Sequence, residues 1–185
     1  MSGRRSLLAA LRLTLVLWLL SVVVTTGPLL LLAPLLAPEQ AEGSLLRRDG
    51  VVVGSRLIGQ PAPLARYLQG RPGRNPHRAP ADPELAARVA AAAAVWQRQG
   101  TAFPAPALLL DSGSGVDPHL PLAAARQQLP RLAAARGLSL VVLEPLLKQA
   151  QQGPWRLQAI EPVVNVLVFN LALDQLQPAD PPGAA

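Results

Sequence analysis

The sequence has no cysteine, a single lysine (Lys148) and few aromatic residues, which make up 3% of its 185 residues. The lack of cysteine excludes disulfides, thiolate metal ligands and a cysteine nucleophile. The formal net charge of +6 is modest, and the motifs of the folds that read DNA or RNA are absent. We therefore expect no nucleic-acid partner.

What the sequence does have is a long apolar run near its N-terminus. Residues 13–36 are 24 consecutive positions without a charge. A helix of that length rises about 36 Å, and the hydrocarbon core of a bilayer is about 30 Å thick, so tilt can absorb the excess. Gly27-Pro28 and Pro34 are expected to bend or end this helix, since proline has no amide hydrogen to donate. The pattern predicts a transmembrane helix over residues 13–36.

A cleaved signal peptide is the alternative interpretation of this run. The apolar core of a signal peptide is usually about 7–15 residues long. The run here is longer, and residues 33–38 (Ala-Pro-Leu-Leu-Ala-Pro) offer no clear small-residue cleavage site. We therefore expect a retained single-pass anchor in the lipid bilayer of the inner (plasma) membrane.

The arginines on either side of the span indicate its orientation. Arg4, Arg5 and Arg12 precede it without any acid, and only Arg47 and Arg48 follow closely, among three acidic residues. The positive-inside rule then predicts a short cytoplasmic N-terminus over residues 1–12 and an extracytoplasmic domain over residues 37–185.

Residues 37–185 are expected to form one small mixed domain of the α+β class, with a hairpin near residues 44–55 and three to four helices. Asp49-Gly50 supplies the positive φ angles of a tight hairpin turn. Asp82 is a typical helix cap, followed by Pro83 in the first turn, and Gly100 ends the helix. The remaining expected elements are a strand over residues 107–110, a helix over 121–136, another after Ser139, and a helix over 163–176, whose β-branched start also suits a strand.

Residues 112–119, Ser-Gly-Ser-Gly-Val-Asp-Pro-His, are the most distinctive loop of the chain. The loop resembles a phosphate-binding loop in composition only, because the Gly-Lys-Ser/Thr ending is missing and Asp117 would repel phosphate. Ser112 or Ser114 with His119 could suggest a hydrolase, but the spacing of a nucleophile elbow is absent. Asp117 and His119 are too few ligands to indicate a metal site. We expect a turn that fixes the start of the next helix, with no catalytic residue and no metal.

Two polar features remain open on the pattern alone. Gln128 and Arg131 share a helix face, and their amide and guanidinium could bind a base, a phosphate or a partner's carboxylate; an exposed polar pair is the alternative. The loop that carries Arg66, Arg71, Arg74 and Arg78 is either a solvated loop or a docking surface for acidic protein or lipid headgroups.

Taken in order, several segments resemble the C subunit of the Kdp potassium-transporting ATPase. They are Gln40-Ala-Glu-Gly-Ser44, Leu57-Ile-Gly-Gln60, Tyr67-Leu-Gln-Gly-Arg-Pro72, Ser112-Gly-Ser-Gly-Val-Asp-Pro-His119, Gln128-Leu-Pro-Arg131, Val163-Val-Asn-Val and Asn170-Leu-Ala-Leu-Asp174. The ordered set, rather than any one piece, carries the resemblance, which runs from the anchor to about Leu176.

The resemblance implies a non-catalytic accessory subunit of a high-affinity, ATP-driven potassium uptake complex. Its partners would be a channel-like potassium subunit and a P-type ATPase subunit, which hydrolyses ATP. The family's C subunit is needed for assembly and is described as a catalytic chaperone that raises the ATPase subunit's affinity for ATP. No firmly bound cofactor is expected, and ATP would be met only in a ternary complex.

The resemblance also assigns roles to particular residues. Gln128 and Arg131 correspond to a pair assigned to nucleotide contact, which leads to the alternative of a nucleotide-binding regulatory module facing the cytoplasm. An extracytoplasmic domain cannot meet cytoplasmic ATP, so the expected topology favours a cap on the channel subunit's external face. The residues expected to contact partners or structure the loops are Gly70, Arg71, Pro72, Ser112, Gly113, Ser114, Gly115, Asp117 and His119.

One stretch departs from the family pattern. The family usually has a long Ser/Gly/Asn-rich segment after its Gly-Arg-Pro element. Here residues 70–72 continue through residues 73–77 almost directly into the helix capped by Asp82. The resemblance therefore does not extend to any partner contact that the longer segment makes.

Overall fold

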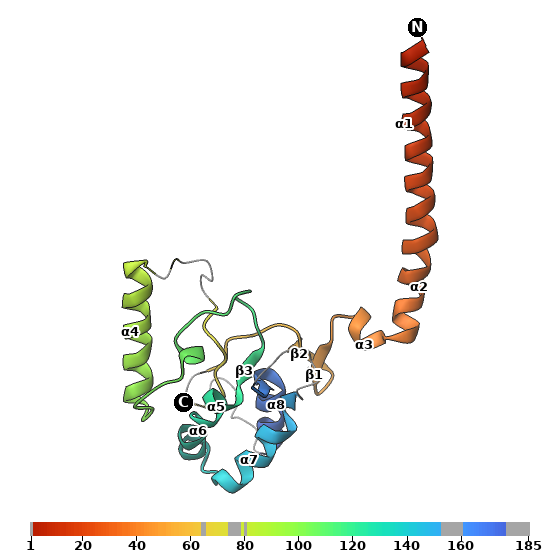
Figure 1. Cartoon of the computed structure of the whole chain (residues 1–185). Helices are drawn as coiled ribbons and strands as arrows, with labels where there is room; N and C mark the ends of the chain where they lie inside the picture. Colours follow the sequence, from red (N-terminus) through yellow and green to blue (C-terminus); the bar gives the residue numbers. More distant parts are fainter. Residues whose placement is uncertain (1, 64–65, 74–78, 80, 153–160, 177–185) are drawn as a thin grey trace. The chain divides into compact units, whose positions relative to one another are not determined.

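The computed structural model describes residues 2–63, 66–73, 79, 81–152 and 161–176 (Figure 1). The chain divides into two compact units, Met1–Leu45 and Leu46–Ala185. Each unit is considered by itself.

The first unit is dominated by one long helix. It consists of α1 (Ser2–Ser21), a π-helical turn η1 (Val22–Thr26) and α2 (Gly27–Leu36), followed by the short helix α3 (Pro38–Ala41). From Gly3 to Leu36 this helix has 34 residues, and its most apolar window has a mean hydropathy of 2.4 with no side chain buried. The length and composition fit a membrane anchor. Residues 2–12 are helical as well, since leucine, alanine and arginine are good helix formers.

The π-helical turn shows how the helix accommodates its prolines. Because Pro28 has no amide hydrogen, it cannot bond the carbonyl four residues earlier. The looser turn Val22–Thr26 lies just before it, and the Thr25 hydroxyl donates to the Ser21 carbonyl at 2.7 Å. The helix therefore changes from α to π geometry just before Gly27-Pro28, where a bend or an end is expected. It does not end there, and it continues through Pro34 to Leu36.

The second unit begins with the expected hairpin, β1 (Leu45–Arg48) and β2 (Val51–Ser55). Asp49 and Gly50 have φ angles of 52° and 79°, which confirms the predicted tight turn. Helix α4 (Pro83–Arg98) is also confirmed. The Asp82 carboxylate accepts a hydrogen bond from the Glu84 amide at 2.9 Å, which satisfies a free donor of the first turn.

A small antiparallel sheet lies at the centre of the second unit. Its strands are β3 (His119–Pro121), β5 (Val163–Asn165) and β4 (Gln151–Gln152), in the order β3-β5-β4. His119 is paired with Asn165, so the end of the 112–119 loop is fixed to the middle strand.

Helices α5 (Leu122–Arg126), α6 (Leu129–Arg136), α7 (Leu140–Gln149) and α8 (Val166–Leu176) complete the unit (Figure 1). Helix α7 packs against both α6 and α8. The core is mainly leucine, and the largest fully buried apolar side chains are Phe169, Leu68, Leu108, Leu120, Leu132, Leu143, Leu147, Leu173 and Val164. This arrangement confirms the α+β class.

Three expected elements differ from the structure. Residues 107–110 do not form a strand; a single 3₁₀ turn, η2 (Pro106–Leu108), is found there, since prolines at 104 and 106 cannot donate to a ladder. A single helix was expected over 121–136, but Pro121 belongs to β3 and the remaining residues form two helices, α5 and α6. The break between these helices lies just before Pro130. The helix expected over 163–176 begins only at Val166, because its first three residues form β5.

Candidate functional site

The residues that the sequence singles out meet at one segment, residues 66–73. This segment contains no helix or strand, yet one of its residues, Leu68, is fully buried. Side chains of α6 and α8 hold residues 66–69, and the 112–119 loop contacts residues 72–73. The segment therefore joins the two groups of predicted residues.

Gln128, which lies just before α6, holds the segment by its side-chain amide. Its Oε1 accepts from the Gln69 N–H at 2.8 Å, and its Nε2 donates to the Gln69 carbonyl at 2.9 Å. The amide thus replaces the partner that a neighbouring strand would provide. Gln128 has no exposed surface, so the alternative of an exposed polar pair is wrong.

Arg131 completes this contact from the next turn. Its Nη2 donates to the Tyr67 carbonyl at 2.9 Å and to Gln128 Oε1 at 3.1 Å. Its guanidinium lies 5.8 Å from the centre of the Trp96 ring, and burial lowers the pKa of Arg131. The pair is turned toward the interior of the domain. Nucleotide contact by these two residues stays a prediction, and Gln128 already uses both acceptor positions and one of its two donors.

Two residues of α8 hold the same segment and were not identified as site residues from the sequence. The Asn170 amide accepts from the Leu68 N–H at 2.9 Å and donates to the Leu68 carbonyl at 3.0 Å. Asp174 lies one turn further along the same face. The available signal was the spacing of Asn170 and Asp174, four apart, within a mainly apolar helix.

Asp174 is the centre of a buried charge network. It is 7% exposed and accepts from Arg48 (2.7 Å) and the Tyr67 hydroxyl (3.0 Å) on Oδ2, and from Arg136 (2.8 Å) on Oδ1. Arg136 is 3% exposed, lies 4.7 Å from the centre of the Tyr67 ring and donates through Nε to the Arg66 carbonyl. Burial, together with the neighbouring Asp174 carboxylate, raises the pKa of Tyr67. These bonds connect the hairpin, α6 and α8 with residues 66–67.

The 112–119 loop packs closely against residues 59 and 72–73. The buried Ser112 donates its N–H to the Pro72 carbonyl at 3.3 Å, and its hydroxyl accepts from the Asp117 amide. The Gly59 N–H donates to the Val116 carbonyl at 2.7 Å. A Cβ on Gly59 would lie 2.6 Å from the Asp117 carbonyl oxygen. A Cβ on Gly73 would overlap the Gly115 carbonyl oxygen. This proximity requires glycine at both positions.

Asp117 and His119 form a local pair at the end of this loop. The Asp117 carboxylate accepts from the His119 N–H at 3.0 Å and lies 3.2 Å from Nδ1 of its ring. The hydrogen bond with His119 lowers the pKa of Asp117. Ser114 accepts only from the Val116 amide, and within the described part of the chain no hydrogen bond joins a serine hydroxyl to His119. Those same residues contain no cluster of three metal-ligating side chains.

The other predicted residues have smaller structural roles. Arg71 donates weakly to the Asp111 carbonyl at 3.4 Å, and the position of a Gly70 Cβ would be in ordinary contact with Val166. Gly113 faces open space. Arg74 and Arg78 of the basic loop lie outside the described residues, as does most of the stretch that departs from the family pattern.

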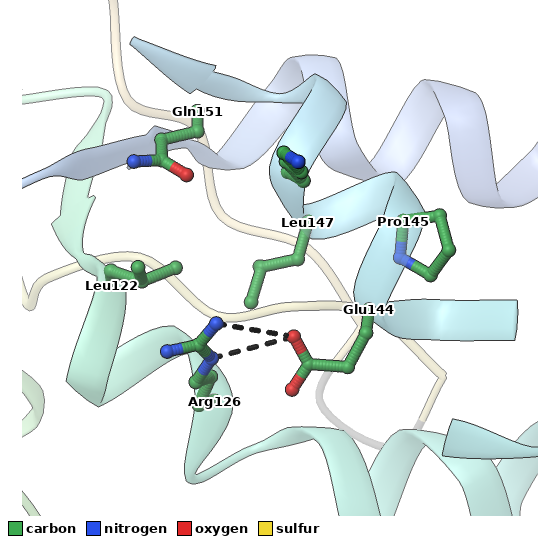
Figure 2. Close-up of a pocket in the computed structure, with 7 residues that line it drawn as sticks. Leu122, Arg126, Glu144, Pro145, Leu147 and Gln151 are labelled. Carbon is green, nitrogen blue, oxygen red and sulfur yellow. Dashed lines mark hydrogen bonds and ion pairs between the residues drawn. The ribbon is translucent and has the colours of Figure 1, made fainter. Parts of the chain in front are cut away.

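A groove of about 590 Å³ lies apart from these contacts, between α5 and α7 (Figure 2). Arg126 points across it toward Glu144, with both guanidinium contacts at 3.4 Å, and Leu122 and Leu147 line its apolar part. None of the residues predicted from the sequence lines it.

These features define a class of protein: an α+β domain joined to one apolar helix that fits a membrane anchor, with its distinctive polar residues used to hold loops. The particular family follows from comparison with known proteins. The family model KdpC, described as the c chain of the K⁺-transporting ATPase, matches residues 7–175, and the chain belongs to this family.

Curated relatives agree with this assignment. The chain is 46% identical to a protein of Xanthomonas campestris pv. campestris (strain B100) over 152 residues, which cover 76% of this chain and 73% of the relative. It is 43% identical to a protein of Methylibium petroleiphilum over 188 residues (91% and 98%) and 41% identical to one of Pectobacterium atrosepticum over 186 residues (91% and 97%). Each of these is named potassium-transporting ATPase KdpC subunit.

Proposed function

We propose that this protein is a non-catalytic accessory subunit of a potassium-transporting ATPase, which stabilises the assembled complex. The family assignment and the long apolar helix Gly3–Leu36 support this role. Its partners in the proposal are a channel-like potassium subunit and a P-type ATPase subunit, and hydrolysis of ATP resides in the latter.

The use of the polar residues is the observation that carries the proposal. The side chains of Gln128, Arg131 and Ser112, which a ligand or substrate would need, all bond the chain's own backbone. A domain built in this way presents fixed loops and is suited to docking against another protein. We propose no catalytic residue and no firmly bound cofactor.

The apolar side chains on these loops indicate the docking face. Leu57, Ile58 and Val116 are about half exposed, and they lie on the two loops that the Gly59–Val116 hydrogen bond joins. Burying such a group against a partner is favourable, at about 25 cal/mol per Å² of apolar surface. We propose that this face docks on the external face of the channel-like subunit.

The proposed orientation places the N-terminus in the cytoplasm and the folded domain outside the inner membrane. The arginines before the span support it. In this orientation the subunit influences ATP affinity only through the assembled complex. The alternative, a cytoplasmic nucleotide-binding regulator that uses Gln128 and Arg131, requires the opposite orientation and a rearrangement of the Gln69 contacts.

A pull-down in mild detergent tests the docking proposal. Tagged full-length protein should copurify with a channel-like subunit and a P-type ATPase subunit. Val116→Asp should reduce their recovery, and Val141→Asp, the same change at an exposed valine of α7, should not. Recovery of the wild-type protein alone, under conditions that preserve other membrane complexes, contradicts the proposal.

The orientation can be tested by labelling, because the chain has no native cysteine. Phe103→Cys introduces one thiol at a side chain that is 88% exposed. A membrane-impermeant maleimide should label it in cells whose outer barrier is opened but whose inner membrane is intact. Labelling only after the inner membrane is permeabilised would reverse the proposed orientation and favour the nucleotide alternative.

A further inference from the structure

A second groove, of about 390 Å³, lies between the β1–β2 hairpin and helices α7 and α8. Its apolar part is formed by Val168, Leu171 and Ala172 of α8, and its polar part includes the arginines Arg47, Arg48 and Arg56. None of the sequence-derived site residues lines this groove, and the proposed function does not use it.

The three arginines differ in how they are used. Arg48 is bound to the buried Asp174 at 2.7 Å. Among the described residues, Arg47 bonds only the Gly50 carbonyl of its own turn, at 3.4 Å. The Arg56 side chain has no hydrogen bond or ion pair to any other described residue. Two guanidinium groups beside an apolar surface are thus available to an anion.

The acidic residue of the groove does not neutralise them. Asp49 is 93% exposed on the hairpin turn, and its carboxylate lies 3.8 Å from Arg48, the arginine that Asp174 already holds. Gln149 and Gln175 are the other polar lining residues, and both are uncharged. The groove therefore carries an excess of positive charge.

The position of the hairpin in the sequence indicates which anion is near. Arg47 follows Leu36, the last residue of the long helix, by eleven positions. The Ser44 N–H donates to the Glu39 carbonyl at 2.6 Å, so this linker is partly folded back on itself. Glu39 lies three positions after Leu36, and Arg47 lies three positions after Ser44. Each of these two stretches spans at most about 11 Å. Chain connectivity therefore limits how far Arg47 can lie from Leu36, where an apolar span would end.

We propose that this groove binds an anionic phospholipid of the leaflet in which the span ends. Arg47 and Arg56 bind the headgroup phosphate, because a guanidinium matches phosphate oxygens with two parallel hydrogen bonds. The apolar surface of α8 contacts the glycerol and the upper acyl carbons. Basic groups beside a membrane span are attracted to anionic lipid in the same way. The bound lipid fixes the hairpin, and through Arg48 and Asp174 the core, at the bilayer surface.

Native mass spectrometry of the full-length protein in detergent tests this site, with phosphatidylglycerol and phosphatidylcholine added in turn. Wild-type protein should retain phosphatidylglycerol in preference to phosphatidylcholine. Each arginine near an anionic surface contributes about fivefold in binding, so Arg47→Gln with Arg56→Gln should weaken phosphatidylglycerol binding about 25-fold. The matched control, Arg98→Gln with Arg126→Gln, removes the same charge elsewhere and should change binding less than twofold.

Three results would overturn the proposal. The first is equal retention of the two lipids by the wild-type protein, a comparison that does not depend on how any variant folds. The second is an equal loss of phosphatidylglycerol in the two double variants. The third is glycerol phosphate binding as tightly as the lipid, which would assign the groove to a soluble anion. No partner subunit is present, so these outcomes are independent of the proposed docking function.

Discussion

The long N-terminal helix and segment 66–73 satisfy their backbone polar groups in opposite ways. In the helix the backbone groups bond partners about one turn away, except where Pro28 and Pro34 have no N–H to donate, and none of the side chains in its apolar window is buried. Segment 66–73 has no such ladder. The N–H and carbonyl of Leu68 bond Asn170, 102 positions away, and those of Gln69 bond Gln128, 59 positions away.

This difference determines which substitutions each region tolerates. An apolar helix keeps its backbone bonds when one side chain is exchanged for another of similar hydrophobicity. In segment 66–73 one distant side chain supplies both partners of a residue, so its removal leaves two backbone groups unsatisfied at once. Single substitutions should therefore have their largest effects at positions remote in sequence from the segment that they support.

The largest effect is expected for Asp174→Ala. This change leaves the Arg136 guanidinium, 3% exposed, without its carboxylate and also removes the partner of Tyr67 and Arg48. Breaking a buried pair by removing one member costs about 3–5 kcal/mol. The free energy of unfolding, measured by denaturant titration of the full-length protein in detergent, should fall by that amount.

Glu144→Ala is the matched control for this prediction. It also removes a carboxylate from an arginine, Arg126, but that pair is exposed and its contacts are 3.4 Å long (Figure 2). An exposed ion pair contributes about 0–1 kcal/mol. If the two variants lose similar stability, the Asp174 network does not hold the segment.

A smaller loss is expected for Gln128→Ala. The N–H and carbonyl of Gln69 both lose their partner, and partial access of water to the half-buried Gln69 limits the loss to about 2 kcal/mol. Gln127→Ala is the control, because Gln127 also bonds two backbone groups, the Ala105 N–H and the Phe103 carbonyl, but at an exposed position. It should cost about 0.5 kcal/mol or less. Chemical denaturation of both variants gives the comparison.

The same variant separates the structural role of Gln128 from nucleotide contact. If Gln128 acts by holding Gln69, the assembled pump with Gln128→Ala should yield less intact complex, while the KM for ATP of the complex that remains is unchanged. A raised KM with normal yield and normal stability would instead favour direct contact with nucleotide.

A third prediction concerns the packing of the 112–119 loop. Gly59→Ala places a Cβ 2.6 Å from the Asp117 carbonyl oxygen, which is backbone and cannot rotate away. Overpacking of this kind costs about 1–3 kcal/mol. Gly113 lies in the 112–119 loop and faces open space, so Gly113→Ala should change the stability very little. Thermal unfolding of the two variants measures the difference. Equal melting temperatures would show that the loop at Gly59 and the 112–119 loop can move apart without loss of stability.

Elements with local signals could be predicted from the sequence. The long apolar helix, the Asp49-Gly50 hairpin and the capped start of α4 each depend on residues that are neighbours in the chain. The predicted site residues were also informative as a group, because the Gln128–Arg131 pair and the 112–117 loop both contact segment 66–73. What they do there could not be predicted, since it depends on partners 40 or more positions away.

The remaining elements depend on tertiary contacts. Residues 163–165 form a strand because β3 and β4 pair with them on both sides, and neither pairing has a local signal. The apolar run at 107–110 has strand composition, but its prolines and the burial of Leu108 favour a single turn. The Asp174 network joins four separate parts of the chain, so a sequence pattern shows only that two polar residues share one face of α8.

The smallest expected effect concerns pH and the local pair at the end of the 112–119 loop. Because the hydrogen bond with His119 lowers the pKa of Asp117 in the folded protein, the unfolded chain binds a proton at this carboxyl more readily. This contribution to stability is complete above the unfolded pKa of about 3.9 and is lost as the pH falls through the lower folded value. Asp117→Asn removes the charge but keeps an oxygen that can accept from the His119 amide. The variant should therefore be less stable than wild type at pH 5, and the difference in stability should shrink as the pH falls toward 2.5.

Asp49→Asn is the control, because it changes a carboxylate that is 93% exposed, and its difference from wild type should not shrink in this way. Melting temperatures of the three proteins across this range test the pair, and a difference between wild type and Asp117→Asn that stays constant with pH would contradict it.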